Sequence, residues 1–254
     1  MRPATIARLE SLLQARKLDG TLQGRRGSDS AGPVCSTSDP ILDAALGGGW
    51  PAGELSEVAG GRSTGRTSLL IGTLAAGADR GPVALVDAVD RFDPPSAARA
   101  GLKLARLLWV RGPAVTVEIT RSTRLEPVVH QAVRAFDLIV RAGGFAVVAL
   151  DLADVPIRCL QQLPAATWMR IARANEGRPT ACLLVGPAPI GRSARGISVV
   201  LAGRTIWQGT SPQSRQFLGF QPELRKSNVD IRTATSGTHT HLRSRRASAR
   251  RTQA

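Results

Sequence analysis

The stretch Gly60-Gly61-Arg62-Ser63-Thr64-Gly65-Arg66-Thr67 decides how the rest of the sequence is interpreted. It has the spacing G-x-x-x-x-G-x-[ST] of a phosphate-binding loop (P-loop), in which glycines let backbone N–H groups wrap a phosphate at a helix N-terminus. The apolar segment Leu55 to Ala59 precedes the loop, and an amphipathic pattern from about Gly65 to Asp79 follows it. The sequence therefore predicts a strand, a P-loop and a helix. The alternative is a glycine-rich turn without chemical consequence.

Within this loop we expect the nucleotide-binding residues to be Gly60, Gly61, Gly65, Arg66 and Thr67. The position that normally holds lysine is Arg66, and its planar, longer guanidinium is a poor substitute for a compact ammonium between terminal phosphates. Thr67 keeps the hydroxyl that would hold Mg²⁺.

A second element of a phosphate site is the apolar strand Phe145 to Leu150, which ends in Asp151. P-loop proteins present in this form the aspartate that steadies a Mg²⁺-bound water. We expect Asp151 to sit beside the P-loop strand near Thr67. Its alternative role is to cap the turn from Leu152 to Pro156.

Outward from the loop, apolar segments alternate with helical patterns, which predicts an α/β fold with a mainly parallel twisted sheet flanked by helices. Helices are predicted at Glu126–Ala142 and about Leu160–Asn175. Further along, short runs separated by Gly and Pro predict antiparallel strands at the C-terminal edge. The apolar segments are 83–86, 97–102, 107–110, 145–150, 181–185, 197–201, 205–208 and 217–224.

Both ends of the chain differ from this core, which we assign to residues 40–231. The pattern of residues 1–18 predicts an amphipathic helix whose apolar face includes Leu9, Leu12 and Leu13. Residues 19–39 are predicted to be a linker that joins this helix to the core. Residues 232–254 hold almost no core-forming residues and predict a disordered basic tail. We expect this tail to bind DNA or an acidic partner without sequence specificity, through Arg243, Arg245, Arg246, Arg250 and Arg251.

The composition restricts the class of protein. The 254 residues are 43% hydrophobic, which suits one sizeable domain, and the formal net charge of +15 favours polyanions or acidic surfaces as partners. The three cysteines are too far apart for a disulfide framework, which favours a reducing cytoplasm. No apolar run approaches the length of a membrane span, so we expect no membrane partner.

Four segments resemble the RecA/Rad51 ATPase core in their order and spacing. They are the P-loop, Leu85-Val86-Asp87-Ala88-Val89-Asp90-Arg91-Phe92-Asp93-Pro94, Leu107-Leu108-Trp109-Val110 and Val147 to Asp151. The resemblance covers about residues 40 to 230 and implies a RecA-like fold. Within that superfamily the chain looks most like the ImuA family of translesion-synthesis accessory proteins, which Ala15-Arg16-Lys17-Leu18-Asp19-Gly20-Thr21-Leu22 also resembles.

The resemblance implies site residues, and several of them are altered here. Val89 stands where active members hold the glutamate that polarises water, and Asp90 would need a local distortion to replace it. Asp93 matches a turn near the adenine edge, with capping of the following helix as its alternative. Pro187 follows the strand after which a γ-phosphate sensor is expected. Of the paired lysines that reach a neighbouring subunit, only Lys226 fits, and Asn228 stands where the second would be. The alternative for Lys226 is an ordinary solvated residue.

From these departures we expect a non-catalytic RecA-like accessory factor in SOS-induced translesion DNA synthesis, in the cytoplasm and associated with the nucleoid. The resemblance implies a Y-family polymerase-like protein, an error-prone replicative polymerase, RecA, DNA and further copies of the chain as partners. We expect no cofactor, with ATP or ADP and Mg²⁺ as the alternative. The alternative functions are a DNA-dependent ATPase of the RecA type and an inhibitor of RecA filaments or cell division.

Overall fold

The computed structural model describes residues 33–114, 125–191, 196–209, 214, 216–227 and 239–240. The N-terminal unit, Met1–Ala31, lies outside these residues. Outside them also lie Leu9, Leu12 and Leu13 of the predicted helix and the five arginines assigned to the basic tail.

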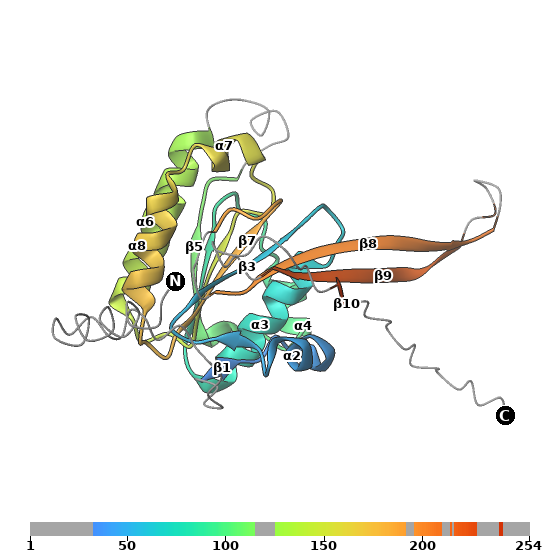
Figure 1. Ribbon diagram of the computed structural model, residues 1–254, viewed down its shortest axis with the longest axis horizontal. Coiled ribbons are helices and arrows are strands. Elements are labelled where there is room, and N and C mark those ends of the chain that lie inside the picture. Colours follow the sequence, from blue (N-terminus) through green and yellow to red (C-terminus); the bar gives the residue numbers. More distant parts are fainter. Residues whose placement is uncertain are drawn as a thin grey trace, which may run out of the picture. The chain divides into compact units, whose positions relative to one another are not determined.

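An eight-stranded sheet forms the centre of the fold, in the order β10-β9-β8-β3-β7-β6-β4-β5 (Figure 1). Neighbouring strands from β8 to β5 run parallel, whereas β9 and β10 are antiparallel additions beyond β8. This confirms the predicted mainly parallel sheet with antiparallel strands at the C-terminal edge. The strands are β3 Leu55–Gly60, β4 Val83–Asp87, β5 Leu107–Arg111, β6 Val147–Asp151, β7 Ala181–Gly186, β8 Ser198–Gln208, β9 Gln216–Ser227 and β10 His239–Thr240.

Helices cover both faces of the parallel part of the sheet (Figure 1). On one face lie α2 (Pro40–Leu46), α3 (Arg66–Arg80) and α4 (Pro94–Arg99), and a short 3-10 turn, η2 (Leu104–Arg106), leads into β5. On the other face lie α6 (Leu125–Ala142), α7 (Ile157–Gln161) and α8 (Ala165–Asn175). Two apolar cores result, one on each side of the sheet.

Strand β4 shows why the sequence folds this way. All five of its residues are buried, as expected for a parallel strand covered on both faces. Val83 and Leu85 enter the core with α3, whereas Ala84 and Val86 enter the core with α6, because successive side chains on a strand point to opposite faces.

The predicted linker is wrong at its C-terminal end. A two-stranded antiparallel ribbon pairs β1 (Val34–Cys35) with β2 (Trp50–Pro51), and Asp39 caps α2 by accepting from the N–H groups of Ile41 and Leu42. The buried Trp50 indole donates to Thr73 Oγ1 of α3 at 3.0 Å. Residues 33–39 therefore belong to the folded core, held by contacts with residues far along the chain.

Three element predictions also needed correction. The helix predicted over Leu160–Asn175 is divided into α7 and α8, because Pro164 has extended backbone angles and precedes α8. The segment 97–102 holds the end of α4 and a turn at Gly101, whose φ is 97°. The runs 197–201 and 205–208 form one strand, β8, because the ladder with β9 continues through Gly203 opposite Pro222.

The predicted disordered tail is wrong at one place, since β10 pairs His239 with Arg225 and Thr240 with Leu224 of β9. All three cysteines are free and buried. Among the helices of the described residues, none has the length and apolar character required to cross a membrane.

Candidate phosphate site

The backbone of the loop after β3 makes the tight turn that its glycines predict. A Cβ on Gly60 would lie 2.4 Å from the carbonyl oxygen of Leu201, so only glycine fits there. The loop closes through a hydrogen bond from Thr64 Oγ1 to the carbonyl oxygen of Gly61 at 2.8 Å. Gly65, with a φ of 94°, is the residue immediately before α3 and has no side chain to cap it. The strand, loop and helix therefore have the predicted order.

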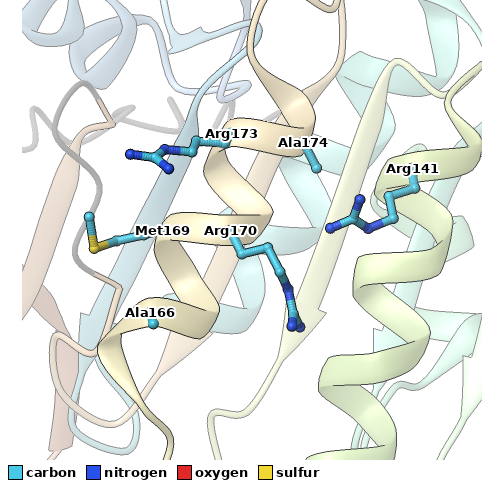
Figure 2. Close-up of a pocket in the computed structure, with 6 residues that line it drawn as sticks. All are labelled: Arg141, Ala166, Met169, Arg170, Arg173 and Ala174. Carbon is cyan, nitrogen blue, oxygen red and sulfur yellow. The ribbon is translucent and has the colours of Figure 1, made fainter.

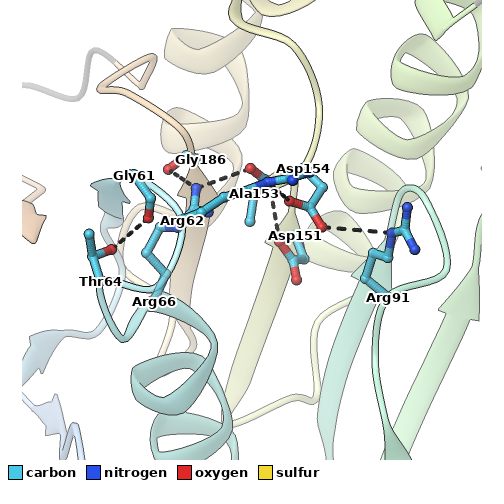
Figure 3. A network of polar contacts seen from close by, with 9 residues as sticks. All are labelled: Gly61, Arg62, Thr64, Arg66, Arg91, Asp151, Ala153, Asp154 and Gly186. Atoms are coloured by element: carbon cyan, nitrogen blue, oxygen red, sulfur yellow. Dashed lines mark hydrogen bonds and ion pairs between the residues drawn. The ribbon is translucent and has the colours of Figure 1, made fainter. Parts of the chain in front are cut away.

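The Arg66 side chain is turned inward from the first residue of α3. It is buried, with 7% of its surface exposed, and its Nη1 donates to the carbonyl oxygens of Ala153 and Gly186, both at 3.0 Å. Figure 3 shows the guanidinium reaching from the loop to the segments that follow β6 and end β7. Burial lowers the pKa of Arg66, opposed by the negative charges of Asp151 and Asp154. The loop cation is thus bonded to the protein's own main chain.

Asp151 lies at the end of β6, buried, and its Oδ1 accepts from the N–H of Ala153 at 2.8 Å. Burial raises the pKa of Asp151 to about 6; the Ala153 hydrogen bond acts against this, the charge of Asp87 adds to it, and Arg66 opposes it. Asp151 therefore caps the turn that follows β6, which is the alternative role predicted for it. The predicted position beside the P-loop strand is wrong, because β7 lies between β3 and β6.

The fold family implies a Mg²⁺-bound nucleotide at such a loop, and the side chains can be tested against it. Thr67 is exposed on the first turn of α3, as a Mg²⁺ ligand would need to be. Arg66, however, already places a cation near Asp151, and its Nη1 donates to two main-chain carbonyl groups and not to phosphates. The side chains therefore do not fit a metal-bound nucleotide in the arrangement that the loop spacing implies.

Exposed ion pairs surround the loop. Asp154 lies 3.5 Å from Nε of Arg62 and 3.7 Å from Nε of Arg91, so it connects the P-loop with the turn after β4 (Figure 3). The Arg62 side chain is 79% exposed, and a pair this open to water contributes little to stability.

The turn after β4 has an apolar side chain at the position where the resemblance implies a catalytic glutamate. Val89, at the position where the resemblance implies glutamate, is buried in the core with α6. Asp90 has the local distortion that it would need, a φ of 56°, but its carboxylate pairs with Arg111 at 2.8 and 3.0 Å. The hydrogen bond from Arg111 lowers the pKa of Asp90, which makes it a weaker proton acceptor.

The turn's other carboxylates act as main-chain acceptors. Asp87 is buried and accepts from the N–H groups of Arg91 and Phe92, at 3.0 and 2.8 Å. Asp93 caps α4 by accepting from the N–H of Ser96, which is one of the two roles predicted for it. Among the described residues, Asp93 forms no hydrogen bond or ion pair with the P-loop.

Sequence reasoning missed Glu57, a buried carboxylate on the P-loop strand. Its Oε2 accepts from the N–H groups of Ile190 and Gly191 at 2.9 and 2.7 Å, and Oε1 accepts from Ser198 Oγ at 2.7 Å. Glu57 thereby fixes the segment after β7 where a phosphate sensor was expected. The signal available in the sequence was one acidic residue, next to Ser56, inside the predicted strand Leu55 to Ala59.

Of the two positions that the resemblance places against a neighbouring subunit, the structure describes one. Lys226 lies on β9 opposite Val199, and Asn228 lies outside the described residues.

Comparison with known proteins matches residues 23–154 to the RecA N-terminal domain, a segment that includes the P-loop and Asp151. The RecA protein of Chlorobaculum tepidum is 34% identical over 132 residues, which cover 50% of this chain and 34% of that protein. The RecA protein of Prochlorococcus marinus is 41% identical over 108 residues, which cover 41% of this chain and 27% of that protein. The similarity thus spans about a third of these relatives' length.

Proposed function

The chain belongs to the RecA N-terminal domain family, and we propose that it is a non-catalytic accessory protein of translesion DNA synthesis. It would use the RecA-like core as a scaffold that joins a polymerase-like partner to damaged DNA. ATP would not drive this assembly.

One observation carries the non-catalytic part of the proposal: the buried Arg66 guanidinium donates to the carbonyl oxygens of Ala153 and Gly186. A P-loop cation acts by binding the terminal phosphates and stabilising their negative charge as they react. A guanidinium held by two main-chain carbonyls would have to give up both hydrogen bonds before it could reach a phosphate. The loop of this chain therefore stabilises the carboxyl ends of its own strands.

The turn after β4 supports the same conclusion independently. Catalysis by a general base needs a carboxylate within reach of the attacking water. Val89 is buried and apolar, and Asp90 is paired with Arg111. Loss of one positioned catalytic group typically costs about 10²-fold or more in rate, and here several are changed together.

The partners follow from the resemblance to the ImuA family and are part of the proposal. They are a Y-family polymerase-like protein, an error-prone replicative polymerase and non-specifically bound DNA, with RecA as a further candidate. We assign DNA or acidic-partner contacts to the arginines of residues 232–254, and contacts between copies or with a partner to Leu9, Leu12 and Leu13. A reducing cytoplasm, close to the nucleoid, would be its location.

The test is a binding experiment between the full chain and a purified Y-family polymerase-like protein, by calorimetry, with and without MgATP. We expect a complex whose affinity is the same in both conditions, because no described feature of the loop couples nucleotide to a surface. Absence of a complex would refute the scaffolding role. A complex that forms only with ATP would refute the non-catalytic reading and favour a RecA-type ATPase.

A further inference from the structure

A shallow groove opens on the side of the sheet opposite α3, between α6 and α8. Its volume is about 470 Å³, and Arg141 of α6 lines it together with Ala166, Met169, Arg170, Arg173 and Ala174 of α8. Figure 2 shows Arg141 extending from α6 toward α8, Arg170 extending from α8 into the space between the two helices, and Met169 and Arg173 extending from the side of α8 that faces away from α6.

The groove carries more positive charge than its own carboxylate can neutralise. Asp137 of α6 pairs with both Arg141, at 2.9 Å, and Arg170, at 3.6 Å. Arg173 is exposed and forms no ion pair with any residue in the described part of the chain. Two guanidiniums therefore share one carboxylate, and Arg173, which has no ion pair among the described residues, favours an anionic ligand.

The arginines surround apolar side chains. Met169 is 49% exposed and is flanked by Ala166 and Ala174, one turn away on α8 or slightly more. Methionine adapts its shape to different partners, and arginine and methionine are both enriched at protein interfaces. A flexible apolar centre with a cationic rim matches the apolar stripe and acidic flanks of an amphipathic segment.

We propose that the α6–α8 groove is a docking site for an acidic, amphipathic helical segment of a partner protein. Glutamate or aspartate side chains of that segment would bind Arg173 and the free donors of Arg141 and Arg170, while its apolar residues would cover Met169. This proposal is independent of the role in translesion synthesis, since any protein that presents such a segment would fit.

A protein ligand suits the groove better than a nucleic acid does. Asp137 lies among the arginines and would repel a phosphate backbone, whereas a peptide can place its carboxylates away from it. None of the six lining residues is aromatic, so the groove offers no surface on which bases could stack.

The test uses a synthetic helical peptide with a leucine stripe flanked by glutamates, titrated into the ¹⁵N-labelled full chain. We expect the largest amide shift changes at residues 137–141 and 166–174. Arg173→Glu should weaken binding by about tenfold or more, as expected for an interface arginine. The matched control is Arg99→Glu, which makes the same charge change on α4, across the sheet, and should change the affinity less than about twofold.

Three results would overturn the proposal. Shift changes centred elsewhere would place the peptide on another surface. Equal losses of affinity for Arg173→Glu and Arg99→Glu would mean that the peptide responds only to net charge. A single-stranded oligothymidine that shifts the same amides at lower concentration than the peptide does would make the groove a nucleic-acid surface.

Discussion

Two buried carboxylates, Glu57 within β3 and Asp151 at the end of β6, differ in the number of hydrogen bonds that they accept. Glu57 on β3 accepts three hydrogen bonds, from the Ile190 and Gly191 N–H groups and the Ser198 hydroxyl. Asp151 on β6 accepts one hydrogen bond from a main-chain N–H, and its pKa is raised to about 6. A buried charge stabilises a fold only when its hydrogen bonds are satisfied. Glu57 therefore stabilises the folded state, whereas the charged form of Asp151 destabilises it, and Arg66 offsets part of that cost.

The largest effect expected from this comparison is that of Glu57→Ala. It leaves two half-buried N–H groups and one buried hydroxyl without an acceptor. A fully buried group costs about 1–3 kcal/mol, and water can reach the two N–H groups in part, so we expect a total loss of about 3–5 kcal/mol. Urea denaturation measures it. Glu57→Gln keeps one acceptor oxygen and should lose less. A loss below about 1 kcal/mol for Glu57→Ala would show that the three hydrogen bonds do not hold this segment.

Arg66→Ala should have the next largest effect, a loss of about 2–3 kcal/mol at pH 7, because hydrogen bonds from a charged group contribute about 1.5–3 kcal/mol. Arg66 also opposes the raised pKa of Asp151, so its removal raises that pKa further. At pH 5 Asp151 would then bind a proton and avoid the cost of an unpaired buried charge. Thermal unfolding at the two pH values should give the smaller loss at pH 5, and an equal loss would disprove the coupling.

Asp151→Asn should stabilise the protein at pH 7, in contrast to both variants above. The native pKa of about 6 exceeds the ordinary value of 3.8, so the native state binds the proton more tightly than the unfolded chain does. The contribution of Asp151 to stability is therefore complete below about pH 4 and is lost as the pH rises through 6. We expect a gain of about 1–2 kcal/mol at pH 7, below the limit of about 3 kcal/mol set by the shift. The gain should vanish at pH 4, and destabilisation at pH 7 would contradict the assignment.

Asp154→Ala should have the smallest effect. It removes two ion pairs, to Arg62 and Arg91, in which the arginine side chains are 79% and 45% exposed. Pairs of this kind contribute between 0 and about 1 kcal/mol, so the midpoint of urea denaturation should barely move. A loss as large as that of Arg66→Ala would mean that the surface network, and not the buried guanidinium, holds the loop in place.

The sequence was sufficient for the features that depend on local pattern. The glycine spacing predicted the turn at 60–65, and apolar runs of four to six residues predicted β4, β5, β6 and β7 to within two residues. The hydrogen bonds that hold the phosphate-site loop and the segment after β7 join residues far apart in the sequence. Arg66 donates to the carbonyl oxygen of Gly186, and Glu57 accepts from the N–H of Gly191. Neither pairing leaves a periodic signal, because each depends on which strand ends become neighbours after the sheet has formed.

The same reason explains the errors at the two ends of the core. The ribbon of β1 and β2 is short, and its stability comes from the packing of Cys35 and Trp50 in the core with α3, which composition alone does not reveal. Asp151 was predicted beside the P-loop strand, yet β7, which comes later in the chain, inserts between them. Strand order is a property of the crossover connections and not of either strand's sequence.

The central claim, a RecA-family core without an ATP motor, is tested most directly by phosphate release from MgATP with saturating single-stranded DNA. A RecA protein measured under the same conditions serves as the positive control, and Val89→Glu is measured beside the unaltered chain. We predict that both forms of this chain release phosphate at the background rate, because restoring a base at position 89 leaves Arg66 bonded to the main chain. DNA-stimulated turnover comparable to that of RecA, in either form, would contradict the account.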